Sequence, residues 1–104
     1  MVERQQIQVC VTIDFGFLGA GKIEETVAVP EHGTVLDALR RTAPVVTSRR
    51  FGMEYFVQAI GGIKNDLVND RGWQFEVNGH RSNVPAERYL VKNGDWIKWI
   101  YLPS

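Results

Sequence analysis

The chain has 104 residues, of which 44% are hydrophobic and 23% are charged. These values exclude the disordered and collagen-like classes, and the length predicts a single domain over residues 1–104. Twelve basic and twelve acidic residues cancel, so we predict no binding to nucleic acid or to an anionic membrane surface. No apolar run approaches the roughly 20 residues that are needed to span a bilayer.

A β-hairpin is predicted at the start of the chain. In residues 6–15 every second side chain is apolar, which is the period of a half-buried strand. Residues 23–29 resume an extended, β-branched pattern. The glycine-dense connection 16–21 lacks the Gly-Lys-Ser/Thr ending of a phosphate loop and precedes a strand, so phosphate binding is not expected. Its apolar residues Phe17 and Leu18 either fold back onto the core or contact a partner.

A short helix is predicted after the hairpin. Thr34 is a favourable N-cap, and Asp37 can complete a capping box with it. Apolar residues then form a stripe along a helix of about two to three turns, which Pro44 closes. We expect residues 44–53 to form a connector and residues 54–60 to form a third strand.

The clearest strand signals lie in the last third of the chain. Residues 73–78 alternate apolar with polar side chains, and Asn78-Gly79 predicts a type I′ turn. The segment 80–87 is expected to be irregular, with one helical turn at 83–87 and a short extended piece at 89–91. A last strand follows the turn at Gly94 and Asp95. If its positions Ile97, Trp99 and Tyr101 face the helix, then Trp96, Lys98 and Ile100 look outward, unless loops such as 16–22 cover that face.

Side chains that could perform catalysis are few. Cys10 is the only cysteine, which excludes an internal disulfide and a cysteine-based metal cluster. We predict a structural, half-exposed thiol there, with a nucleophile as the alternative. A triad of Ser82, His80 and Glu87 would need glycines of a nucleophile elbow, and the serine and histidine lie too close together on an irregular loop. The sequence therefore predicts no enzyme.

Two features of the charged and polar residues leave alternatives open. His32 precedes the helix cap and is expected to be a loop residue, with metal binding as the alternative. Four arginines fall within eleven residues that contain no acid: Arg40, Arg41, Arg49 and Arg50. They form either a solvated surface or a patch for an anion or a partner.

The order of these elements resembles the β-grasp arrangement of ubiquitin-like domains. Residues 55–63, the Gly-Trp and Val-Asn-Gly groups within 72–79, and the Gly-Asp turn with its aromatic strand within 89–101 resemble the C-terminal domain of transcobalamin and its bacterial relatives. The resemblance implies an α+β, β-grasp (ubiquitin-like) fold, with a mixed sheet of four to five strands and one helix packed on one face. It also implies that the last strand pairs beside the first in the middle of the sheet.

The resemblance implies a non-catalytic binding module for a small ligand or a protein partner. In transcobalamins this domain closes over cobalamin that a separate helical domain also holds, so we expect at most half of a corrinoid site here, with cobalamin as the candidate cofactor. The predicted ligand-binding residues are Trp73, Gly61, Gly62, Trp96, Lys98 and Ile100. The alternative is a homo-oligomeric structural or interaction protein, in which an exposed strand pairs with the same strand of a second copy.

The N-terminal segment is polar and has no apolar run of the signal-peptide type. The sequence as written therefore predicts a cytoplasmic protein, or a secreted or surface protein if a leader has been removed.

Overall fold

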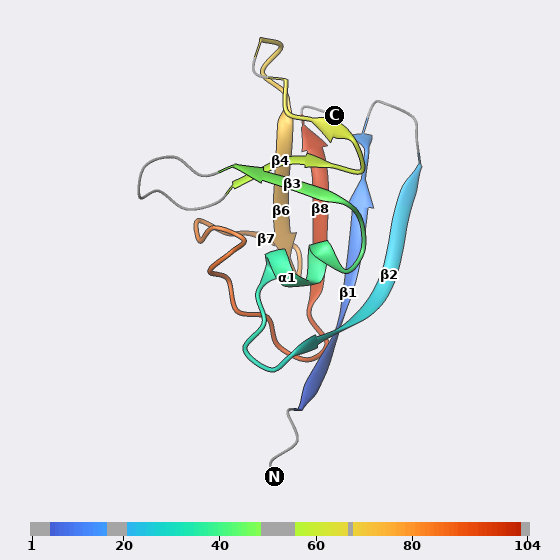
Figure 1. Cartoon of the computed structure of the whole chain (residues 1–104), viewed down its shortest axis with the longest axis vertical. Helices are drawn as coiled ribbons and strands as arrows, with labels where there is room; N and C mark the ends of the chain where they lie inside the picture. The colour runs from blue at the N-terminus through green and yellow to red at the C-terminus, as the bar shows by residue number, and fades with distance from the viewer. Residues whose placement is uncertain (1–4, 17–20, 49–55, 67, 103–104) are drawn as a thin grey trace.

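The first and last strands of the chain lie side by side at the centre of the main sheet. The computed structural model describes residues 5–16, 21–48, 56–66 and 68–102. Over these residues the main sheet has five strands in the order β2 (Lys22–Pro30), β1 (Gln6–Asp14), β8 (Trp96–Leu102), β6 (Gly72–Val77) and β7 (His80–Arg81) (Figure 1). β1 and β8 are parallel, whereas the other neighbours are antiparallel. The predicted α+β class, the mixed sheet and the central pairing of first and last strands are confirmed.

One face of the main sheet carries the hydrophobic core. Alternate residues of the two central strands are almost completely buried on that face: Val9, Val11 and Ile13 of β1, and Ile97, Trp99 and Tyr101 of β8. Because strand neighbours point to opposite faces, the residues between them lie on the other side of the sheet. The Asn78-Gly79 turn has φ angles of 53° and 84°, which both central positions of a type I′ turn require. The predicted periodicity and turn are confirmed.

The helix α1 (Val35–Arg40) packs on the core face over β1 and β2. Thr34 Oγ1 accepts a hydrogen bond from Asp37 N at 3.2 Å, and Asp37 Oδ2 accepts one from Thr34 N at 2.9 Å. The predicted capping box is therefore confirmed. The helix has six residues and its C-cap is Arg41, so it ends before Pro44.

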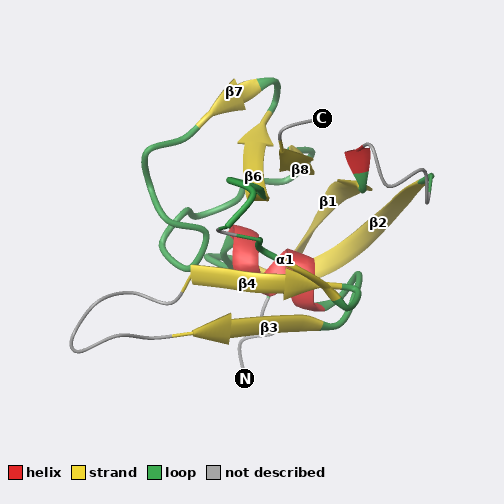
Figure 2. Ribbon diagram, turned by 90° about the horizontal axis from the view of Figure 1, so that it is seen from above, coloured by secondary structure: helices red, strands yellow, loops and turns green. Residues whose placement is uncertain are grey.

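A second, three-stranded sheet lies on the same side of the main sheet as α1 (Figures 1 and 2). It contains β3 (Val45–Ser48), β4 (Phe56–Ile60) and β5 (Ile63–Lys64), all antiparallel. The prediction of a connector was wrong for residues 45–48, because the β-branched run Val45-Val46-Thr47 finds a pairing partner in β4. The predicted strand is confirmed over 56–60, while residues 54 and 55 lie outside the described part of the chain.

The segment between β6 and β8 is more ordered than its composition indicates. His80 and Arg81 pair with β6 as the short strand β7, where an irregular segment was expected. The single turn expected at 83–87 lies at 86–88, and the N–H groups of Arg88 and Tyr89 both donate to the carbonyl of Pro85. The expectations for Phe17, Leu18, Arg49 and Arg50 fall outside the described residues.

Asn65 joins the two sheets. Its Oδ1 accepts the N–H of Trp73 in β6 at 2.9 Å, and its Nδ2 donates to the carbonyl of Val57 in β4 at 3.0 Å. A Cβ atom at Gly72 would lie 3.1 Å from Oδ1 of Asn65, so only glycine lets the amide approach β6 this closely. Asn65 is therefore one of the side chains that fix the position of the second sheet over the first.

We expect Asn65→Ala to lower the free energy of unfolding by about 2 kcal/mol, because a half-buried donor and acceptor both lose their partner. Urea unfolding measures the change. The matched control is Asn83→Ala, at an exposed position, where the effect should stay within about 0.5 kcal/mol. Equal unfolding midpoints for the two variants would contradict the proposed link between the sheets.

Candidate functional site

The structure divides the predicted ligand-binding residues between two faces. Trp96, Lys98 and Ile100 lie together on the face of the main sheet opposite α1, as the alternation in β8 requires. Trp73 is buried on the core face. The glycines Gly61 and Gly62 form the turn between β4 and β5, with φ angles of 58° and 83°. These six residues do not converge on one site.

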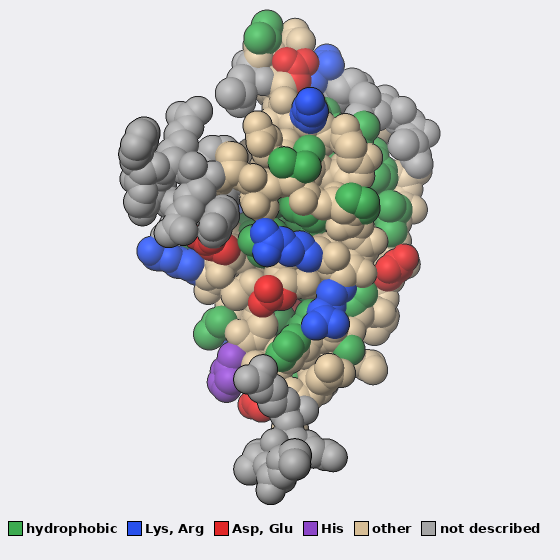
Figure 3. Space-filling model, viewed as in Figure 1, with side chains coloured by type: hydrophobic (Ala, Val, Ile, Leu, Met, Phe, Trp, Pro, Cys, Tyr) green, Lys and Arg blue, Asp and Glu red, His purple; other side chains and the backbone are tan. Residues whose placement is uncertain are grey.

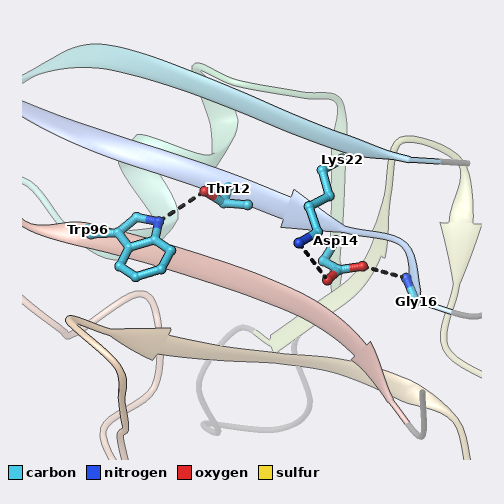
Figure 4. A network of polar contacts seen from close by, with 5 residues as sticks. All are labelled: Thr12, Asp14, Gly16, Lys22 and Trp96. Carbon is cyan, nitrogen blue, oxygen red and sulfur yellow. Dashed lines mark hydrogen bonds and ion pairs between the residues drawn. The ribbon is translucent and has the colours of Figure 1, made fainter.

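On the outer face, Trp96 is held flat against the sheet. It is 44% exposed, yet its indole N–H donates to Thr12 Oγ1 on β1 at 2.9 Å (Figure 4). Its backbone N–H donates to Asn78 Oδ1 at 2.9 Å. Thr12 is only 4% exposed although it lies on the outer face, which is consistent with the indole lying over it. The predicted outward direction of Trp96 is confirmed, and the residue is held through both its indole N–H and its backbone N–H.

Cys10 lies beside Trp96 on the same outer face and is half-buried. Burial raises the pKa of its thiol, and the negative charge of Glu24, whose Oε1 lies 3.9 Å from Sγ, raises it further. A raised pKa keeps the thiol protonated near neutral pH, and the protonated form is a poor nucleophile. This environment favours the predicted structural role of Cys10.

The core face contributes a groove beside β6 that the sequence did not predict. One hollow of about 270 Å³ is lined by Val57, Asn65, Trp73, Phe75, Pro85, Ala86 and Trp99. A second hollow of about 270 Å³ shares three of these residues and extends along Gln74 and the loop 81–84. We call the two together the β6 groove. A further hollow of about 510 Å³ adjoins it at the start of β6, around Arg71 and Leu102.

The walls of the β6 groove are fixed by contacts from distant parts of the chain. The wall formed by Pro85 and Ala86 is held by α1, since the Leu36 N–H donates to the Ala86 carbonyl at 3.1 Å. N–H groups in the first turn of a helix have no partner within the helix, so they are available for such a bond. The opposite wall is formed by Val57 of β4 and by Asn65, which directly follows β5. The sequence of loop 82–86 has no periodic pattern, so it does not predict the wall that Pro85 and Ala86 form.

Aromatic rings pack in pairs under the groove. Phe75 packs against Trp99 with ring centroids 5.0 Å apart, and Trp73 packs against Tyr101 at 5.1 Å. The indole N–H of Trp73 donates to the carbonyl of Ile63 at 2.8 Å. The indole Nε1 of Trp99 is also buried but has no hydrogen-bond partner among the described residues. Buried polar atoms nearly always have a partner, so the indole of Trp99, a residue that lines the inner hollow, keeps an unused donor.

Catalytic and metal-binding groupings find no support in the residues described. Ser82 Oγ is occupied by a local turn, in which it accepts the Val84 N–H at 2.9 Å. Among the described residues there is no group of three or more His, Cys, Asp or Glu side chains that could hold a metal ion. The same part of the chain contains no helix long and apolar enough to cross a membrane. On the face seen in Figure 3, hydrophobic side chains are interspersed with charged ones, so on that face a concave site is a better candidate than a flat apolar patch.

Comparison with known families identifies the class of this domain. The family model described as "Domain of unknown function (DUF4430)" matches residues 33–102. The chain belongs to this family, which consists of transcobalamin-like domains. The predicted resemblance to the C-terminal domain of transcobalamin is therefore confirmed. A search of curated proteins finds no match to the chain.

Two solved structures share the fold. Haptocorrin in complex with Cbi superposes with a TM-score of 0.82 at 15% identity, over 97% of this chain and 26% of the haptocorrin chain. A candidate metal-binding protein from Ruminococcus gnavus superposes with a TM-score of 0.72 at 16% identity, over 91% of this chain and 95% of that one. The chain thus spans about a quarter of the haptocorrin chain and nearly all of the second protein.

We expect Thr12→Val to release the indole of Trp96 from the sheet. Valine keeps the shape of threonine but removes the acceptor, and water can reach the half-exposed indole, so stability should change by less than about 1 kcal/mol. Hydrogen exchange of the Trp96 indole N–H, followed by NMR, should become about fivefold faster. Thr26→Val, at an exposed position of β2, is the matched control. Unchanged exchange in Thr12→Val would show that this hydrogen bond does not fix the ring.

Proposed function

We propose that the protein is a non-catalytic binding module that holds part of a small ligand, in the first place a corrinoid, in the β6 groove. The observation that carries this proposal is Trp99, which lines the inner hollow and whose buried indole N–H has no acceptor among the described residues. A ligand that offers a carbonyl or carboxylate oxygen there would satisfy it. Haptocorrin, which shares the fold, is known in complex with Cbi.

The lining of the groove suits a ligand with an apolar face and polar edges. Phe75 and Pro85 offer apolar surface, whereas Gln74, Arg81 and Ser82 stand at the outer hollow. A corrin ring has this character, because its macrocycle is largely apolar and its periphery carries amide groups. Each hollow measures about 270 Å³, which is below the usual size of a complete drug-sized site. The groove would therefore hold one edge of a corrinoid, and another surface would cover the rest.

We also propose that the fold is of the β-grasp type. The support is the central parallel pairing of β1 with β8, the antiparallel pairing of β1 with β2, and the presence of α1 on one face. The second sheet on the same face as α1 is an addition to the simple arrangement of one sheet and one helix.

The alternative function, self-association through an exposed strand, has weaker support. β2 is an edge strand of the main sheet, so its outer backbone groups are available for pairing. However, Glu24 and Glu25 lie near the middle of this edge and are exposed. Exposed charges on an edge strand oppose its pairing with a second copy, so the groove is the better candidate for function.

We expect cobinamide to bind the protein and Val84→Asp to weaken that binding about tenfold, because Val84 lines the groove and a carboxylate there would have to be desolvated by the ligand. Isothermal titration calorimetry measures both affinities. Val84 is 44% exposed, so the substitution should leave the fold intact.

Two variants complete this experiment. Val46→Asp is the matched control, since Val46 is 55% exposed on β3 and does not line the groove. Trp96→Ala removes the fixed ring of the outer face and should leave the affinity unchanged. Loss of cobinamide binding in Trp96→Ala, with normal binding in Val84→Asp, would move the ligand to the outer face. Absence of cobinamide binding in the parent protein would rule out the corrinoid assignment.

A further inference from the structure

A separate cavity of about 340 Å³ lies at the opposite end of β1 from the β1–β2 connection. It is lined by Ile7, Glu31, His32, Leu90, Val91, Lys92 and Asn93, none of which lines the β6 groove. We call it the β1-end cavity. Its size falls within the range of small-molecule sites, and neither the family nor the proposed function accounts for it.

Backbone hydrogen bonds hold the three segments around this cavity. The Val91 N–H donates to the Gly33 carbonyl at 3.0 Å, and the Glu31 N–H donates to the Gln5 carbonyl at 3.0 Å. The Gln8 N–H donates to Asn93 Oδ1 at 2.9 Å. These bonds fix the walls of the cavity relative to one another, and small-molecule sites usually have such fixed walls.

The floor of the cavity is apolar and partly open to water. Val91 is buried, Ile7 is half-buried, and Leu90 is 57% exposed. Leu90 is exposed although its backbone is held in place by a β-bridge with Thr34. A bound hydrocarbon chain would remove the exposed surface of Leu90 from water.

His32 has a backbone conformation that is unfavourable for a residue with a side chain. The Gly33 N–H donates to the Pro30 carbonyl at 2.8 Å, which makes Pro30 to Gly33 a tight turn, and His32 has a φ of 70° at its third position. This position favours glycine, because a side chain raises the energy of the left-handed region. Strained non-glycine residues of this kind cluster at ligand sites. Histidine tolerates this region better than most other residues, but the turn alone does not require an imidazole, whereas the cavity uses one.

The polar groups at the cavity are mostly hydrogen-bond donors. Lys92 brings an ammonium group and His32 a ring N–H, and the Nδ2 of Asn93 adds a third donor while its Oδ1 already accepts from Gln8. Glu31 is the one acid in the lining. Its charge makes each negative group on a ligand less favourable, so a ligand with one carboxylate should bind better than a ligand with two.

From this geometry we propose that the β1-end cavity binds a small amphipathic monocarboxylate. The apolar chain lies against Ile7, Leu90 and Val91, and the carboxylate accepts hydrogen bonds from Lys92 and His32. Binding here is independent of the β6 groove, because the two sites share no lining residue.

Octanoate is a suitable probe, and an NMR titration of the amide signals reports where it binds. We expect saturable shifts that concentrate on residues 7, 31–33 and 90–93. Lys92→Gln should weaken octanoate about tenfold, through loss of a charge-assisted hydrogen bond, and Leu90→Ser about threefold. The matched controls, Lys64→Gln and Val46→Ser, are exposed residues outside the cavity and should bind like the parent. Cobinamide should not displace octanoate, which separates this proposal from that for the groove.

His32→Gly tests the strained turn. Glycine relieves the backbone and removes the imidazole, so this variant should unfold at a higher urea concentration and bind octanoate about threefold more weakly. A lower unfolding midpoint for His32→Gly would remove the argument from strain and overturn the proposal. Equal binding of octylamine or of octanedioate would overturn the assignment of a monocarboxylate. Shifts that do not saturate, or that lie outside the cavity, would overturn the site itself.

Discussion

Three side chains hold the segment 63–65 against the main sheet, and the rest of the molecule is arranged around that attachment. The indole of Trp73 and the hydroxyl of Tyr101 donate to the carbonyls of Ile63 and Lys64, at 2.8 and 2.7 Å. Asn65 completes the attachment by bonding to both sheets. Since Val57 and Asn65 form one wall of the β6 groove, the shape of the candidate site follows from hydrogen bonds made by residues that are themselves largely structural.

The elements that the sequence predicts well are those with a strong local cause. Alternating side chains in β1 and β8 and the capping residues of α1 act over a few positions, so the pattern is visible without a structure. β5 has two residues and β3 has four, and both are stabilised by pairing with β4. Such pairing between separate segments cannot be derived from the local sequence, which is why the second sheet was missed.

The same distinction applies to the candidate site. Alternation correctly grouped Trp96, Lys98 and Ile100 on one face, but it also places Trp73 on the opposite face of a neighbouring strand. The groove combines that core face with loop 82–86, whose position depends on a bond from the first turn of α1 to Ala86. Phe75 could have been found, because it shares the period of Trp73. Pro85 and Ala86 could not, because no periodic pattern specifies where an irregular loop packs.

The parallel contact between β1 and β8 has a consequence for how the protein is made. β1 contributes three almost completely buried side chains, Val9, Val11 and Ile13, yet one of its two neighbours in the sheet is encoded more than eighty residues later. During synthesis, β1 has only β2 as a sheet neighbour until the ribosome has released β8, and a hairpin by itself is marginally stable in water. Contacts between such distant positions slow folding, and the hairpin exposes apolar surface in the meantime.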